Sequence, residues 1–213
     1  DFILFIFLEG VSILSKATVN PSTATWTLTT ERIVIAGVLA AITIVLGIVP
    51  NIGFIPLPNA IGSATIEHIP TILSGIIAGP VVGVFSGLVF GVVSFFRSTT
   101  PLFKDPIVSI LPRLFIGLTA WATFLALKRV NRDLAAAVAG VVGSATNTIL
   151  VVGAIILRGY FPAQLIIPTV LVQSIIEAII AGILTVILAR VFTLLEGRVV
   201  RAQDTKPREQ LPY

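Results

Sequence analysis

The sequence contains no cysteine, no methionine and a single histidine, His68. Without cysteine there can be no disulfide, thiolate metal site or cysteine nucleophile, and one histidine leaves too few ligands for most zinc and haem sites. Charged residues are also scarce, at 11% of the chain, whereas soluble domains carry about 25%. We therefore expect neither redox nor metal chemistry, and no resident cofactor.

Apolar residues dominate instead, at 56% of the chain with a mean hydropathy of +1.06. This composition predicts an integral membrane protein, and 213 residues leave room for about six helices of the roughly 20 residues that cross a bilayer. The net charge of +4 could suggest nucleic acid. However, the basic residues fall at expected helix ends, which favours a role in membrane topology.

Apolar segments divide the chain into an all-α bundle with flanking regions. Six membrane spans are predicted, at residues 32–49, 64–79, 81–96, 107–127, 134–157 and 165–195. They form one compact membrane domain over 32–195. Residues 1–31 are expected to form an interfacial helix and a polar linker, and residues 196–213 a cytoplasmic basic tail.

Lysine and arginine residues between the spans predict the orientation of the bundle. Two basic groups belong in the cytoplasm by the positive-inside rule: Lys128, Arg129 and Arg132, and then Arg198, Arg201, Lys206 and Arg208. Both termini are then cytoplasmic, and residues 50–63, 97–106 and 158–164 face outward. Arg97, Lys104 and Arg158 lie on that outer side against the rule, where they could meet an anion.

Small residues repeat at helical spacing in two of the spans. Gly83, Gly87 and Gly91 line one helix face, where a neighbouring backbone can approach closely. The first span carries two similar pairs, Ala36 with Ala40 and Gly37 with Ala41. Periodicity alone leaves open whether such faces pack inside the bundle or against another membrane subunit.

Several segments together carry a resemblance to a known family. They are SATIEHIP at 63–70, AGPVVG at 78–83, DPIVSILPRLFIG at 105–117, GSATNT at 143–148, and Glu177-Ala178. Over about residues 32–195 the chain resembles the substrate-binding S components of energy-coupling factor (ECF) vitamin transporters, and the pattern is most similar to those for pantothenate.

The resemblance implies a six-helix protein of the prokaryotic plasma membrane that captures a vitamin outside the cell. Its partners would be a transmembrane coupling subunit and two cytoplasmic ATPases, which hydrolyse the ATP. The coupling surface would be Ala36, Ala40, Gly37 and Ala41 in the first span. The chain lacks the phosphate-binding loop pattern G-x-x-x-x-G-K-[ST], in agreement with this division of labour.

Polar side chains inside the spans are the candidate ligand contacts, because each is costly in hydrocarbon. Arg113 offers a planar fork of donors to a carboxylate; alternatively, it snorkels to the interface or pairs with Asp105. Asn147 could bind a polar ligand or join two helices. Glu177, with Gln173 one turn earlier, could bind ligand or pair with a basic side chain such as Arg113.

The expected outer mouth adds further candidates. Glu67 and His68 begin the second span, where His68 could equally be a packing residue, and Arg97 ends the third. The proline-rich loop 51–59 is expected to close over a pocket, or else to form a fixed plug. Apolar walls are assigned to its Phe54 and to Phe96 and Phe103.

Other functions predict different features. An S component for another vitamin or precursor, such as hydroxymethylpyrimidine, thiamine, riboflavin or pyridoxine, would share the fold, and a structural assembly subunit would bind no ligand. An intramembrane enzyme could use Glu67, His68 and Glu177, but no catalytic motif accompanies them, so we expect no enzyme. A channel or secondary carrier would show inverted repeats or a chain of buried carboxylates.

Overall fold

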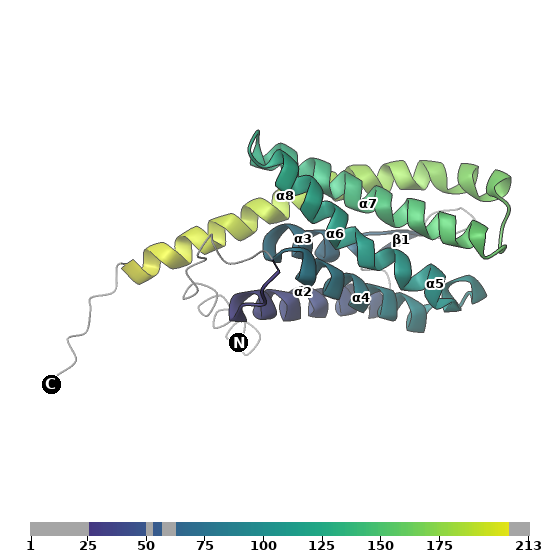
Figure 1. Ribbon diagram of the computed structural model, residues 1–213, viewed down its shortest axis with the longest axis horizontal. Helices are drawn as coiled ribbons and strands as arrows, with labels where there is room; N and C mark the ends of the chain where they lie inside the picture. The colour runs from purple at the N-terminus through teal and green to yellow at the C-terminus, as the bar shows by residue number, and fades with distance from the viewer. Residues whose placement is uncertain (1–25, 50–52, 57–62, 205–213) are drawn as a thin grey trace.

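The computed structural model describes residues 26–49, 53–56 and 63–204. The described chain is a bundle of helices, from which the end of the last helix projects (Figure 1). Its main helices are α2 (Thr30–Ile48), α3 (His68–Ala78), α4 (Pro80–Arg97), α6 (Leu111–Leu127), α7 (Arg132–Leu157) and α8 (Ala163–Asp204). The predicted interfacial helix near the N-terminus lies outside the described residues.

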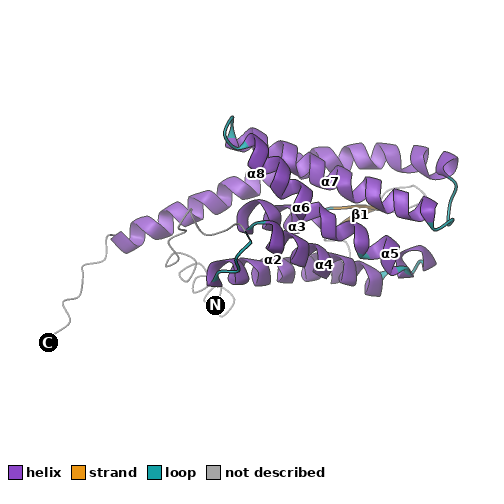
Figure 2. Cartoon of the chain, in the orientation of Figure 1, coloured by secondary structure: helices purple, strands orange, loops and turns teal. Residues whose placement is uncertain are grey.

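Short elements fill two of the connections. Strands β1 (Phe54–Pro56) and β2 (Ser63–Thr65) pair antiparallel between α2 and α3. A 3-10 turn, η1 (Pro101–Lys104), and the single-turn helix α5 (Pro106–Ser109) lie between α4 and α6. Figure 2 shows helix almost everywhere else, so the prediction of an all-α bundle needs only this small β-hairpin as a correction.

Five of the described helices are long and apolar enough to cross a membrane, and α3 is shorter. Helix α3 is therefore shorter than the span predicted at 64–79. Helix α3 has 11 residues, which extend about 16 Å at about 1.5 Å per residue, half of a hydrocarbon core of about 30 Å. Almost all of its side chains are buried, and it contacts α2, α4, α6, α7 and α8, so α3 lies inside the bundle.

Glycine and proline define two of the helix boundaries. Gly79 ends α3 with a φ of 95°, a conformation that glycine adopts without steric cost. Pro80 then begins α4 at a position where its missing N–H is not needed. In the predicted fourth span the helix is interrupted at Ile110, between α5 and α6. Pro112 has no N–H to donate to the carbonyl of Val108, so it cannot continue a helix from α5.

The glycine stripe of α4 packs inside the protein against α6. A Cβ added to Gly117 would lie 2.5 Å from the Cα of Gly83, and one on Gly87 would lie 2.1 Å from the carbonyl oxygen of Arg113. Gly91 makes a similar approach to Ile110. The stripe is therefore an internal packing surface, and it brings the backbone of α6 close to α4.

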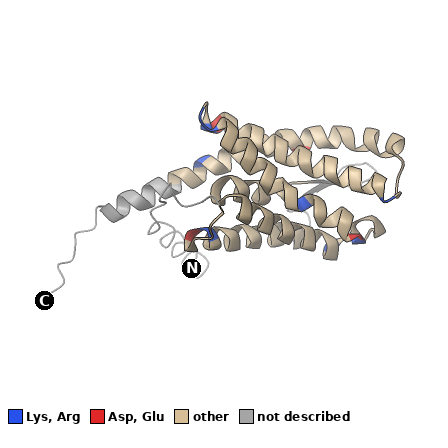
Figure 3. Cartoon of the chain, in the orientation of Figure 1, with Lys and Arg blue, Asp and Glu red and all other residues tan. Residues whose placement is uncertain are grey.

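Apolar side chains cover both the interior and the outside of the bundle. A central cluster joins Ile72, Phe90, Ile116, Ala120, Ala139 and Ala181. Large apolar side chains such as Ile149, Leu157 and Val172 are more than half exposed, as expected for surfaces that contact lipid. Figure 3 shows that the charged residues gather mostly at the two ends of the bundle, in agreement with a membrane-spanning arrangement.

Candidate functional site

A cavity of about 680 Å³ lies among α4, α6, α7 and α8. Its walls include Ser94, Ser98, Thr99, Thr100, Leu102 and Phe103 from α4 and the segment after it, and Phe161, Leu165, Thr169 and Val170 from the start of α8 and the loop before it. The cavity therefore reaches the end of the bundle where the 97–106 and 158–164 connections lie. Its volume is in the usual range of about 300–1,000 Å³ for small-molecule sites.

Six of the predicted ligand residues line this cavity: Glu67, Arg97, Arg113, Asn147, Gln173 and Glu177. They come from five helices or helix caps that are far apart in the sequence. His68 is buried beside Glu67 but is not one of the lining residues. Phe54 lies in β1, where the structure describes only the backbone.

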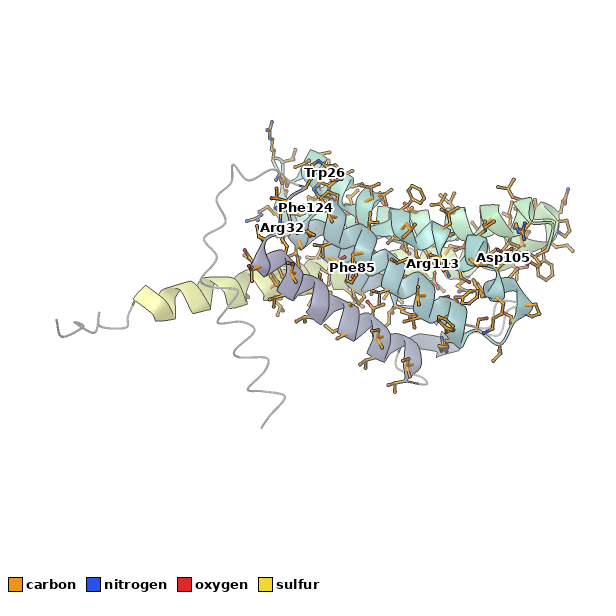
Figure 4. The ribbon with its side chains drawn as sticks, turned by 60° about the horizontal axis from the view of Figure 1, so that its bottom comes forward. Trp26, Arg32, Phe85, Asp105, Arg113 and Phe124 are labelled. Atoms are coloured by element: carbon orange, nitrogen blue, oxygen red, sulfur yellow. The ribbon has the colours of Figure 1, made fainter. Side chains whose placement is uncertain are left out.

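Arg113 is the buried cation of the site. Its side chain belongs to α6, is 5% exposed, and donates a hydrogen bond from Nη1 to the carbonyl of Val108 in α5. The guanidinium lies over two aromatic rings, 5.3 Å from the centre of Phe90 and 5.5 Å from that of Phe103, where cation–π attraction favours it. Asp105, which Figure 4 shows at the end of the bundle, pairs with Arg158 instead, so the alternative of an Arg113–Asp105 pair was wrong.

Glu177 connects the middle of α8 to the strand before α3. Its Oε1 accepts hydrogen bonds from the backbone N–H of Thr65, at 2.8 Å, and from Nε2 of Gln173, at 3.0 Å. These neutral donors take the place of the basic partner that the sequence suggested. A buried carboxylate needs such donors, and the bond from Thr65 also fixes the position of β2 at the cavity wall.

Three lining residues keep buried polar atoms that have no hydrogen-bond partner in the described part of the chain. They are Oε1 of Glu67, Nε of Arg113 and Oδ1 of Asn147. The residues are 1%, 5% and 7% exposed, respectively, and they come from the N-terminal cap of α3, from α6 and from α7. Because buried polar groups are nearly always hydrogen-bonded in folded proteins, these atoms indicate where a bound molecule would bond.

Two sets of polar contacts at the mouth were not predicted from the sequence, although Arg158 itself was expected on the outer side. Ser94, Ser98, Thr99 and Thr100 line the cavity, but serine and threonine near a helix end carry no distinctive signal. The second set is an ion pair: Nε of Arg158 lies 2.6 Å from Oδ2 of Asp105, and the hydroxyl of Tyr160 donates to the same oxygen at 3.2 Å. The Arg158 guanidinium is the main reason why the pKa of Asp105 lies below its usual range.

The aromatic wall is only partly as expected. Phe103 lines the cavity together with Phe90 and Phe161. Phe96 is 74% exposed and is not a lining residue. The prediction for Phe96 was therefore wrong, because at the end of α4 its side chain points outward instead of between helices.

The small-residue face of α2 divides into two parts. Ala40 is buried, and the half-buried Ala36 packs against the apolar cluster of Ile35, Ala78 and Val82. Gly37 and Ala41 are exposed, and nothing lies within 4 Å of a Cβ added to Gly37. Of the two pairs, only Gly37 and Ala41 face away from the bundle.

Taken together, the site suits binding more than chemistry. Two guanidinium groups, two carboxylates and two side-chain amides lie among apolar wall residues, which is the mixture that orients a small polar molecule with an anionic group. Among the described residues there is no group of three or more histidine, aspartate or glutamate side chains that could hold a metal ion.

Comparisons with known proteins agree with this arrangement. The family described as "ECF transporter, substrate-specific component" matches residues 31–189. The pantothenic acid transporter PanT of Lactococcus lactis subsp. cremoris (strain MG1363) is 33% identical over 146 residues, which cover 57% of this chain and 73% of PanT.

A solved structure shares the fold. ThiT from Listeria monocytogenes superposes with a TM-score of 0.56, covering 78% of this chain and 99% of ThiT at 19% identity. At this identity the match concerns the fold alone. With the family match over most of its length, this chain belongs to the substrate-specific components of ECF transporters, which are membrane-embedded transport proteins of the bacterial plasma membrane.

Proposed function

We propose that this S component binds pantothenate in the cavity between α4, α6, α7 and α8, from the outer side of the membrane. The observation that carries the proposal is the set of buried atoms without partners on Glu67, Arg113 and Asn147, which all line this cavity. The identity to PanT over 146 residues supports the choice of vitamin. Residue roles follow from the chemistry of the cavity.

Pantothenate combines a carboxylate, an amide, two hydroxyls and a branched apolar segment, and the cavity offers a complement to each. Arg113 is a donor for the carboxylate, because a guanidinium binds carboxylates through parallel hydrogen bonds, and Arg97 adds a second cation at the mouth. The acceptor atoms of Asn147 and Glu67 suit the amide N–H and the hydroxyls. Phe90, Val151 and Leu165 provide apolar wall for the methyl groups.

The balance of charge favours a ligand with a single negative group. Arg97 and Arg113 both interact electrostatically with Glu67, so the cavity is not a bare cationic pocket. A doubly charged phosphate ester would meet two carboxylates, Glu67 and Glu177, at a cost in a desolvated site. A monocarboxylate with several hydrogen-bonding groups fits this arrangement better.

For energy, the chain would depend on a transmembrane coupling subunit and two cytoplasmic ATPases. Its docking surface would be the exposed side of α2 around Gly37 and Ala41, where the absence of bulk lets another helix approach. Ala40, being buried, would support α2 from within. The basic residues at 128–132 would then face the cytoplasm.

A competition experiment tests the choice of vitamin. Radiolabelled pantothenate is bound to the detergent-purified protein, and unlabelled pantothenate, thiamine, riboflavin, pyridoxine and hydroxymethylpyrimidine are added in excess. The proposal predicts that only pantothenate displaces the label. Displacement by another vitamin at lower concentration, or the absence of saturable pantothenate binding, would contradict it.

A further inference from the structure

A continuous set of contacts joins the loop before α8 to the ligand-facing side of α6. Arg158 and Tyr160 both bond to Oδ2 of Asp105. The other oxygen of Asp105 accepts the backbone N–H of Ile107 at 2.9 Å, so Asp105 also caps α5. Since a side-chain cap stabilises the first turn of a helix, Asp105 fixes the start of α5 relative to α7 and α8.

Helix α5 in turn holds Arg113. The carbonyl of Val108, in α5, accepts a hydrogen bond from Nη1 of Arg113. Ser109, the last residue of α5, donates from Oγ to the carbonyl of Phe103, whose ring lies under the guanidinium. Both contacts of Arg113 on this side therefore depend on where the single turn of α5 lies.

The same ion pair joins the two walls of the cavity mouth. Residues 97–100, 102 and 103 line one side, and Phe161 and Leu165 line the other. Asp105 follows the first wall directly, and Arg158 precedes the second. The side chain of Asp105 is 5% exposed although it lies at the end of the bundle, so this contact is more shielded from water than an ordinary surface pair.

We propose that Asp105, held by Arg158 and Tyr160, is a positioning residue for ligand binding: it sets the place of α5, and through Val108 and Phe103 the orientation of the Arg113 guanidinium toward the ligand's anionic group. This inference rests on the proposed function, in which Arg113 meets a carboxylate. Asp105 itself does not line the cavity, so its effect on affinity is indirect.

A second ion pair in the chain supplies a matched control. Arg190 of α8 and Asp133 of α7 lie 2.6 Å apart, with side chains 64% and 47% exposed. Neither residue lines the cavity. Replacing Asp133 removes a salt bridge between α7 and α8, without touching α5 or the mouth.

The test compares the affinities for pantothenate and for its alcohol analogue pantothenol, which lacks the carboxylate. Asp105→Asn keeps an oxygen that can cap α5 and removes the charge that holds Arg158. We expect affinity for pantothenate to fall by about fivefold, the upper range for a partly exposed ion pair, with a faster dissociation rate. Affinity for pantothenol should change much less, because it does not use the Arg113 charge.

Variants at Arg158 test the same contact from the other side. Arg158→Gln should lose affinity for pantothenate as Asp105→Asn does, whereas Arg158→Lys, which keeps the charge, should recover most of it. Asp133→Asn should bind both ligands as the wild type does. Equal losses for pantothenate and pantothenol, or unchanged affinity for both in Asp105→Asn and Arg158→Gln, would overturn the proposal.

A measurement without ligand separates this inference from the proposed function. The chain has no cysteine, so Ser94→Cys places a single thiol on the cavity wall. A charged, water-soluble methanethiosulfonate reagent should modify this thiol faster in the Asp105→Asn background than in the wild-type or Asp133→Asn background, because the Asp105–Arg158 pair joins the two walls of the mouth. Equal rates in all three would overturn the role of Asp105 even if pantothenate binds, whereas a faster rate would support it even if the vitamin is a different one.

Discussion

The carboxylate of Glu177 accepts the backbone N–H of Thr65 at 2.8 Å, across 112 positions of sequence. This bond connects α8 to the strand that leads into α3, and both residues line the cavity. Glu177 therefore does two things at once: it shapes one wall of the site and holds the β1–β2 hairpin against α8. Substitutions at this position separate the two contributions.

Glu177→Gln and Glu177→Ala should differ in stability. Glutamine keeps an oxygen that can accept from Thr65, so the hairpin stays attached. Alanine leaves that partly buried N–H without its partner, at a cost of about 1 kcal/mol, the low end of the range for an unsatisfied group. Thermal unfolding in detergent should show a clear loss for Glu177→Ala and little for Glu177→Gln. Equal melting temperatures of the two variants would show that the bond contributes nothing.

Arg113→Lys should weaken pantothenate binding although the positive charge remains. Lysine cannot present two parallel N–H groups to a carboxylate, nor stack between Phe90 and Phe103 as a planar cation. We expect a loss of about 1.5–3 kcal/mol, the usual contribution of a hydrogen bond to a charged group. Calorimetric titration measures it. Wild-type affinity in the lysine variant would place the carboxylate elsewhere.

The contact of Gly117 with Gly83 should tolerate no side chain. A Cβ at position 117 would lie 2.5–2.7 Å from three backbone atoms of Gly83, which cannot move as a flexible side chain can. Gly117→Ala should therefore destabilise the bundle by about 1–3 kcal/mol.

Gly153→Ala is the control for this prediction, because nothing lies within 4 Å of a Cβ there. Alanine is the better helix former by about 0.5–1 kcal/mol, so this variant should melt at the same temperature or higher. If both alanine variants melted like the wild type, α4 and α6 would not approach each other as closely as described.

Bulk on the exposed side of α2 should affect assembly and not ligand binding. Gly37→Leu adds a side chain into open space, so vitamin binding by the isolated S component should stay unchanged. Co-purification with a coupling subunit and ATP-driven uptake in proteoliposomes should fall sharply. Ala122→Leu, on an exposed position of α6, is the control. Full uptake by Gly37→Leu would place the docking surface on another helix.

Acid should remove the contribution of the Asp105–Arg158 pair. Arg158 lowers the pKa of Asp105 from its ordinary value of 3.8, so the folded state binds the proton less readily than the unfolded chain does. The stabilisation is then fully present above about pH 4 and is lost as the pH falls through the lowered folded pKa. The difference in melting temperature between wild type and Asp105→Asn should stay constant from pH 7 to pH 5 and shrink below about 3.8. A difference that is already lost at pH 5 would contradict this assignment.

The bundle was predicted well because hydrophobic runs of membrane length can be recognised in the sequence without knowing which helices pack together. The sequence pattern also placed a boundary between the second and third spans at residues 79–81, where the effects of Gly79 and Pro80 are local. The length of α3 was missed, because an apolar segment reads alike whether it contacts lipid or other helices. Ile72 and its neighbours in α3 are buried on all sides because five other helices pack around them, and the sequence of α3 alone does not show this.

Several residues that line the cavity could be singled out from the sequence for the same kind of reason. Arg113, Asn147 and Glu177 stood out because each is polar within an apolar run, and all three line the cavity. Hydrogen-bond partners could not be read from the sequence. Asp105 pairs with Arg158, 53 positions away, and Glu177 pairs with Thr65, 112 positions away. Serine and threonine at the mouth gave no signal, because they are common in membrane helices.

The most direct test of the account is isothermal titration calorimetry of pantothenate into the detergent-purified protein, comparing the wild type with Arg113→Ala, Asn147→Ala and the remote control Arg190→Ala. We predict tight one-to-one binding to the wild type and to Arg190→Ala, and clear loss of affinity in the two cavity variants. Absence of pantothenate binding to the folded wild-type protein, or wild-type affinity in both cavity variants, would contradict it.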